Sequence, residues 1–129
     1  MSQAYYDGIA EWYDGYLSEN PLYQELVLPT LLELVGDIRG QTLCDLACGQ
    51  GWITRELARR GAQMTGFDLS EGLLSIARRY EEQESLGINY LQGDAQRAEH
   101  FPTGIFDGCI CIFSLVDIPD LSAVLQTIA

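Results

Sequence analysis

The stretch Asp45-Leu46-Ala47-Cys48-Gly49-Gln50-Gly51 decides the fold. It begins inside a short apolar run, residues 42–46, of the kind that a buried parallel strand shows. A helical pattern starts directly after it and stops at Gly61. Glycines in such a turn let the backbone pass close to a ligand, and the helix that follows presents free N–H groups and a positive dipole end. The stretch therefore predicts a ligand-binding turn between a strand and a helix.

Strand, turn and helix then alternate along the rest of the chain. We expect strands at 42–46, 63–67, 88–92 and 107–113, and helices at 52–60, 70–84 and from 119 to the end. Helices at 6–17 and 22–35 precede them, and Pro29 should kink or split the second. This order predicts an α/β fold, a Rossmann-like doubly wound parallel sheet with helices on both faces. We divide the single domain into an N-terminal helical cap segment, 1–40, and a Rossmann-like half-domain, 41–129.

Composition excludes several classes of protein. Seven Lys and Arg face nineteen Asp and Glu, giving a net charge of −12, which disfavours a nucleic-acid partner. The N-terminus has no basic region followed by an apolar run, and no stretch approaches the roughly 18 apolar residues that span a bilayer. Four cysteines are too few for a disulfide scaffold. We predict a soluble cytoplasmic protein with no membrane partner, and a solvated helix face carrying Arg55, Arg59 and Arg60.

Acidic residues stand at the ends of the second and third predicted strands. Asp68 lies 17 residues after Gly51, and Asp94 follows the third strand in Gly93-Asp94-Ala95. In doubly wound folds ligands bind outside the carboxyl ends of the strands, and an acid at the second strand accepts hydrogen bonds from a ribose diol. An acid there is also a common turn former or helix cap, and Asp68 precedes a helix that Ser70 could cap.

The glycine turn distinguishes between two nucleotide cofactors. The dinucleotide fingerprint has a third glycine for close helix–strand packing, and this chain has Thr54 in that region. An acid before the turn, Asp45, suits a positively charged ligand better than a pyrophosphate. Both observations favour S-adenosylmethionine over NAD, and an NAD-dependent oxidoreductase is kept as the less favoured alternative.

Four motifs in order resemble those of class I S-adenosylmethionine-dependent methyltransferases of the small-molecule branch. Residues 43–51 resemble the glycine-rich motif, and the second, third and fourth motifs are matched by residues 67–70, 92–95 and 106–120. Residues 6–14, Tyr-Asp-Gly-Ile-Ala-Glu-Trp-Tyr-Asp, are similar to the N-terminal helix of that branch. The resemblance covers nearly the whole chain and implies methyl transfer from S-adenosylmethionine to a small molecule.

The resemblance also implies a role for each matched residue. Asp45, Ala47, Gly49 and Gly51 would surround the methionine part of the cofactor, and Tyr13 would close over it. Asp68 would hold the ribose hydroxyls, with Leu69 packing on the adenine and Asp94 and the Ala95 N–H meeting its edge. Phe113 and Ser114 would border the sulfonium and the methyl acceptor.

Two departures from the family bear on activity. Family members often carry a histidine after the fourth strand, where this chain has Val116 and Asp117, so no catalytic residue is assigned. The cysteine spacings are not those of structural zinc sites, so no metal is predicted either. A non-catalytic module that binds cofactor or a partner is the alternative function.

The sheet of this family has seven strands, usually in the order 3-2-1-4-5-7-6. The sequence supplies four, in the predicted order 3-2-1-4, and stops inside an apparent helix, so we expect a C-terminally truncated domain. The fourth strand would then form an exposed apolar edge. Self-association along that edge is a hypothesis, and a strictly monomeric mass in dilute solution would count against it.

Overall fold

The computed structural model describes residues 3–97, 99, 101–102, 104–112 and 128, without the side chains of residues 3–7. Its elements in chain order are α1 (Gln3–Glu19), η1 (Tyr23–Val27), α2 (Leu28–Val35), β1 (Thr42–Leu46), α3 (Trp52–Arg59), β2 (Gln63–Asp68), α4 (Glu71–Gln83), β3 (Asn89–Gln92) and β4 (Gly108–Ile110). The chain thus alternates strand and helix from β1 onward, as the sequence predicts.

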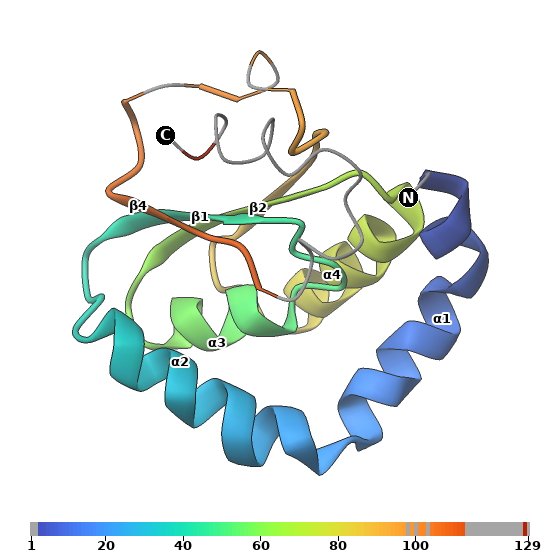
Figure 1. Cartoon of the computed structure of the whole chain (residues 1–129), viewed down its shortest axis with the longest axis horizontal. Helices are drawn as coiled ribbons and strands as arrows, with labels where there is room; N and C mark the ends of the chain where they lie inside the picture. Colours follow the sequence, from blue (N-terminus) through green and yellow to red (C-terminus); the bar gives the residue numbers. More distant parts are fainter. Residues whose placement is uncertain (1–2, 98, 100, 103, 113–127, 129) are drawn as a thin grey trace.

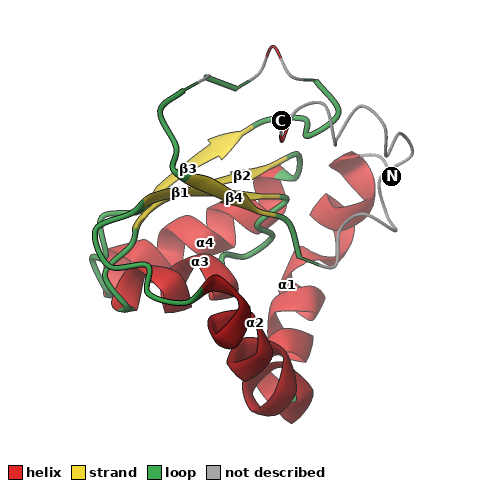
Figure 2. Cartoon of the chain, turned by 60° about the vertical axis from the view of Figure 1, so that its left-hand side comes forward, coloured by secondary structure: helices red, strands yellow, loops and turns green. Residues whose placement is uncertain are grey.

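The four strands form one parallel sheet in the order β3-β2-β1-β4. This confirms the predicted fold class and strand order, whereas the helices expected on both faces cover only one of them within the described residues (Figure 1). In the described part of the chain, α2, α3 and α4 lie on one face of the sheet (Figure 1), and Figure 2 shows the same layering from another side. The segment between β3 and β4 crosses the other face (Figure 1).

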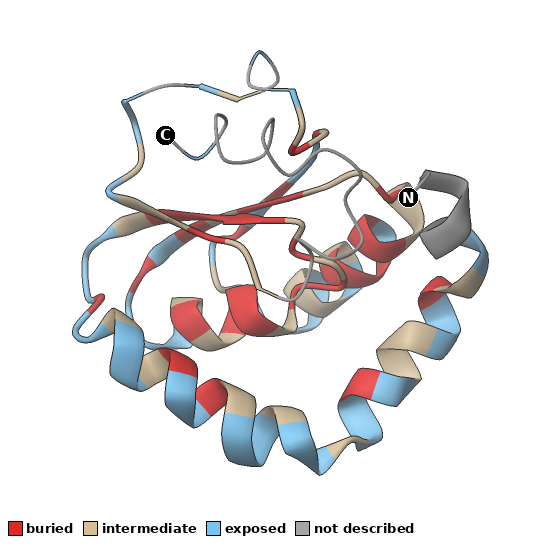
Figure 3. Cartoon of the chain, viewed as in Figure 1, coloured by how far each residue is buried: buried red, intermediate tan, exposed pale blue. Residues whose placement is uncertain are grey.

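Alternation along each strand divides the core between the two faces. On β1, Leu43 joins the core under α3 and α4, while Cys44 and Leu46 pack on the opposite face against Phe67. Phe101, from the segment between β3 and β4, covers Phe67 with a ring-to-ring distance of 4.8 Å. Buried positions concentrate on the strands and on the sheet-facing sides of α3 and α4 (Figure 3). The period-2 pattern of a parallel strand buried on both faces explains this division.

The second predicted helix differs from the observed one. Residues 23–27 form a turn of π-helix, η1, and α2 begins at Leu28 with Pro29 in its first turn. The segment is thus divided one residue before Pro29, which agrees with a split rather than a kink, and a proline is tolerated in the first turn of the helix that follows.

The helix face predicted to be solvated also needs correction. Arg59 and Arg60 are exposed, but Arg55 is only 7% exposed, because α3 is enclosed on that side by α4 and by α1. Ser70 caps α4 as expected, since its side chain accepts a hydrogen bond from the Leu73 N–H.

The fourth strand is shorter than predicted. β4 ends at Ile110 rather than at residue 113, and it forms one edge of the described sheet. Residues 113–127 lie outside the described part, so the predicted last helix and self-association along β4 stay predictions. Within the part described, none of the helices is long and apolar enough to pass through a bilayer.

Candidate cofactor site

The turn after β1 follows a backbone path that demands glycine at Gly51. Ala47, Gly49 and Gly51 have positive φ angles of 56°, 63° and 86°. A Cβ placed on Gly51 would lie 2.5 Å from the hydroxyl oxygen of Tyr90, which stands on β3 under the turn. Any side chain at this position would therefore combine backbone strain with a collision. Tyr90 thus fills the space on the β3 side of the turn, which leaves the opposite side of the turn to face a ligand.

Asp68 fastens this turn to the end of β2. Its Oδ2 accepts a hydrogen bond of 2.8 Å from the Gly49 N–H, and its Oδ1 accepts one of 2.9 Å from the Ser70 N–H. The side chain stays partly exposed. The sequence left Asp68 open between ribose ligand and turn former, and the structure shows that it does organise the turn. Two backbone donors fix the direction of its carboxylate before any ligand arrives.

The end of β3 brings the third group of predicted residues to the same edge of the sheet. The Gly93 N–H donates to the Asp68 carbonyl oxygen at 3.1 Å, which joins the ends of β2 and β3. Asp94 Oδ1 accepts from the Gln96 N–H at 2.9 Å, and Ala95 is buried. The Leu69 carbonyl oxygen accepts from the Gln92 side chain at 3.0 Å. The carboxyl ends of β2 and β3 therefore present Asp68, Leu69 and Asp94 along one edge.

Asp45 lies beneath the turn rather than on its surface. It is 3% exposed, and its Oδ2 accepts a hydrogen bond of 2.7 Å from the Thr54 hydroxyl. Burial raises the pKa of Asp45 to about 7, the Thr54 hydrogen bond opposes the rise, and the nearby Asp68 charge adds to it. Thr54, which replaces the third glycine of the dinucleotide fingerprint, thus serves as the partner of a buried carboxyl.

Helix α1 covers the turn from the other side. A Cβ on Gly49 would lie 3.7 Å from Cε1 of Tyr13, so the tyrosine ring is in van der Waals reach of the glycine turn. Tyr13 also packs on the cluster formed by Ala10 with Leu73 and Ile76 of α4. The structure therefore places Tyr13 at the turn, where the sequence predicted it. Phe113 and Ser114 lie outside the described residues.

Several residues at this site carry no recognisable sequence signal. Asp14, Gln50, Arg55 and Tyr80 form a polar cluster beside the turn, and Tyr90 fills the space beneath it. Asp14 and Gln50 are 36 residues apart, and no periodicity relates residues at that distance. Of the four, Arg55 was assigned a position from the sequence, on a solvated helix face.

Comparison with known proteins identifies the family. A family described as methyltransferase domain matches residues 43–129, which include α3, α4 and all four strands except Thr42, the first residue of β1. The chain belongs to this methyltransferase domain family. The match confirms the resemblance inferred from the four motifs and decides against the NAD-dependent alternative.

Individual relatives agree with this assignment. A ubiquinone biosynthesis O-methyltransferase of Acinetobacter baylyi is 31% identical over 120 residues, covering 91% of this chain and 50% of that protein. The solved S-adenosylmethionine-dependent methyltransferase of Mesorhizobium loti is 31% identical with a TM-score of 0.67, over 77% of this chain and 44% of that one. A protein of Methanococcus maripaludis shares the fold alone, with 20% identity, a TM-score of 0.76 and coverage of 95% and 57%. This methyltransferase domain spans about half the length of the curated relatives that it matches.

The residues present fit S-adenosylmethionine, the cofactor of these methyltransferases. The Tyr13 ring lies 3.7 Å from the position of a Cβ on Gly49, so both residues border the same side of the turn. Two carboxyl groups, Asp45 and Asp68, lie close enough for the charge of one to raise the pKa of the other. A site with this excess of acid suits a sulfonium cation, and the predicted cofactor is thereby supported by the chemistry of the site as well as by the family.

Proposed function

We propose that the whole protein methylates a small molecule and that this domain supplies its cofactor site. The observation that carries the proposal is the double hydrogen bond of Asp68, which fixes one carboxylate between the glycine turn and the start of α4. A carboxylate that is already oriented binds a diol without further ordering. Asp68 would hold the ribose hydroxyls at this place.

The other predicted residues would divide the cofactor among them. Leu69, Asp94 and the Ala95 N–H would meet the adenine, in line with their position at the ends of β2 and β3. Ala47, Gly49 and Gly51 would border the methionine part, with Asp45 beneath and Tyr13 above. Phe113 and Ser114 are assigned to the sulfonium and the methyl acceptor by resemblance alone.

The cofactor brings an activated methyl group, so the chain's residues need only bind and align. Burial raises the pKa of the Asp45 carboxyl under the turn to about 7, and a cationic ligand bound nearby would favour its charged form. Where the acceptor is a hydroxyl or an amine, its proton must leave during the transfer, and no residue of the chain is assigned to accept that proton. The cytoplasmic location, like the division at residue 40, stays a prediction.

Two observations support a small molecule as the methyl acceptor. The net charge of −12 disfavours nucleic acid, and the curated relatives are named for O-methylation in ubiquinone biosynthesis.

The test is to incubate the whole protein with methyl-labelled cofactor and separate pools of metabolites, RNA and protein. We expect label in the metabolite pool only, and its loss in the Asp68→Ala variant. Label in RNA or protein alone would contradict the proposal, and cofactor binding without any transfer would favour the non-catalytic module.

A further inference from the structure

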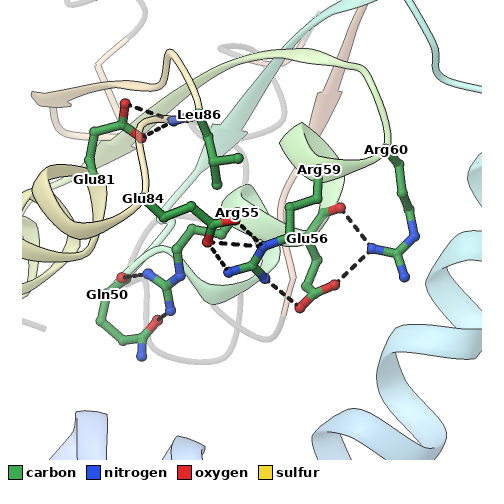
Figure 4. A network of polar contacts seen from close by, with 8 residues as sticks. All are labelled: Gln50, Arg55, Glu56, Arg59, Arg60, Glu81, Glu84 and Leu86. Atoms are coloured by element: carbon green, nitrogen blue, oxygen red, sulfur yellow. Dashed lines mark hydrogen bonds and ion pairs between the residues drawn. The ribbon is translucent and has the colours of Figure 1, made fainter.

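Four polar residues from three parts of the fold form a closed cluster beside the cofactor turn. The Gln50 side chain donates from Nε2 to Oδ1 of Asp14 at 2.6 Å, and the Tyr80 hydroxyl donates to the same oxygen at 3.0 Å. Arg55 donates to the Gln50 carbonyl oxygen at 2.7 Å and to its Oε1 at 3.1 Å (Figure 4). We call these four residues the Asp14 cluster.

The Asp14 cluster satisfies a buried positive charge. Arg55 and Gln50 are 7% and 1% exposed, and the guanidinium carbon of Arg55 lies 3.9 Å from the centroid of the Tyr80 ring. In the described residues Arg55 takes part in no ion pair, whereas its neighbour on α3, Arg59, pairs with Glu56 and Glu84 (Figure 4). Burial lowers the pKa of Arg55, and the Asp14 carboxylate, which the Gln50 amide links to it, is one of the groups that oppose this fall. A buried cation needs such compensation.

Two members of the cluster are joined in sequence to the cofactor site. Gln50 lies between Gly49 and Gly51 of the turn, and Asp14 follows Tyr13, whose ring reaches Gly49. The hydrogen bond between Asp14 and Gln50 therefore ties the covering helix directly to the turn that it covers. Tyr80 ties the same carboxylate to α4.

An ion pair joins α1 and α4 at a different place, away from the turn. Arg79 of α4 and Glu11 of α1 are 2.7 Å apart, with side chains 56% and 75% exposed. Exposed pairs of this kind contribute little to stability. The chain thus offers a matched control, one link between α1 and α4 at the cofactor turn and another on the surface.

We propose that Asp14 is a positioning residue that holds α1 closed over the glycine turn, so that the Asp14 cluster sets how tightly the cofactor is retained. The proposal rests on the proposed function, because it takes the turn between β1 and α3 as the cofactor site. Asp14 acts through the position of Tyr13 and touches no reacting atom.

The test compares Asp14→Ala with Glu11→Ala in two measurements on the same protein. Calorimetry with S-adenosylhomocysteine measures affinity, and hydrogen exchange without ligand measures the opening of α1. For Asp14→Ala we expect a dissociation constant raised roughly tenfold, equivalent to about 1.4 kcal/mol, because two hydrogen bonds to a charged acceptor are lost. We also expect faster exchange in residues 10–19, with α3 largely unchanged. Glu11→Ala should alter neither.

Two milder variants keep the test sharp if Asp14→Ala fails to fold. Tyr80→Phe removes one donor to Asp14 and leaves the ring under Arg55, so a smaller change in the same direction is expected. Asp14→Asn keeps an acceptor for Gln50 and should fall between the wild type and the alanine variant.

Different results would overturn different parts of the proposal. If the wild type binds S-adenosylhomocysteine and both Asp14→Ala and Tyr80→Phe bind equally well, the positioning role is wrong and the proposed function stands. Weaker binding without faster exchange in α1 would mean that Asp14 contacts the ligand, which also contradicts positioning. A wild type that binds no S-adenosylhomocysteine would overturn the proposed function and the inference together.

Discussion

The floor and the roof of the cofactor site are built differently. The floor, the turn after β1 with Asp45, Thr54 and Tyr90 beneath it, is almost entirely buried, and Thr54 is 0% exposed. The roof is α1, where Trp12 is 65% exposed and polar contacts through Asp14 make the link to the turn. Changes in the floor should therefore alter stability, and changes in the roof should alter retention of the ligand.

Gly51→Ala should have the largest effect on stability, because it strains the backbone of the turn and also brings a Cβ into collision with Tyr90. The positive φ costs about 1–2 kcal/mol, and the overlap of the new Cβ with Tyr90 adds about 1–3 kcal/mol. Gly36→Ala is the control, since Gly36 has a φ of 68° and no atom within 4 Å of its Cβ position. Urea unfolding should show a clearly larger loss of stability for Gly51→Ala. Equal losses would mean that Tyr90 does not constrain the turn.

The pH dependence of stability tests the buried carboxyl of the floor. Burial raises the pKa of Asp45 from 3.8 to about 7, so the folded state holds its proton more tightly than the unfolded state. This contribution is complete below pH 4 and disappears as the pH rises through about 7. The unfolding free energy of the wild type should therefore fall by about 2–4 kcal/mol between pH 4 and pH 7, and Asp45→Asn should not show this fall. Asp37→Asn, at an exposed site, should leave the fall in place, and an unchanged fall in Asp45→Asn would contradict the assignment.

Tyr90→Phe should have a smaller effect, and in the opposite direction. The Tyr90 hydroxyl is buried and has no hydrogen-bond partner among the described residues. Removing such a group avoids its desolvation cost, so unfolding free energy should rise by about 1 kcal/mol. Tyr80→Phe, which loses hydrogen bonds to Asp14, should instead destabilise the fold slightly. A lower stability in Tyr90→Phe would show that its hydroxyl forms a useful contact.

The floor was more predictable from the sequence than the roof. Apolar runs of strand length and a serine before a helix are local signals, and they gave the order of elements and the cap at Ser70. The positions of Gly49, Gly51 and Asp68 were recognisable as well, because the turn from a strand to a helix in this type of fold needs such residues at these places.

The remaining features depend on contacts that no local pattern encodes. Arg55 was expected in solvent because arginine on a helix usually is, and its burial depends on hydrogen bonds to Gln50 and on the ring of Tyr80. The proline indicated a break near residue 29, but the sequence did not predict that a π-helical turn would precede it, since such turns are rare. The role of Tyr90 could not be predicted, because its ring occupies the space that a side chain at Gly51 would take, and no local pattern relates these two residues.

The most direct test of the account concerns Asp68. Calorimetric titration with S-adenosylhomocysteine should show saturable binding to the wild type, and NADH should show none. Asp68→Ala should weaken that binding about ten- to a hundredfold, or about 1.5–3 kcal/mol, because a charged acceptor and the anchor of the turn are both lost. Asp37→Ala, at an exposed surface pair, should bind as the wild type does. Equal affinity of Asp68→Ala and wild type would contradict the placement of the cofactor at this turn.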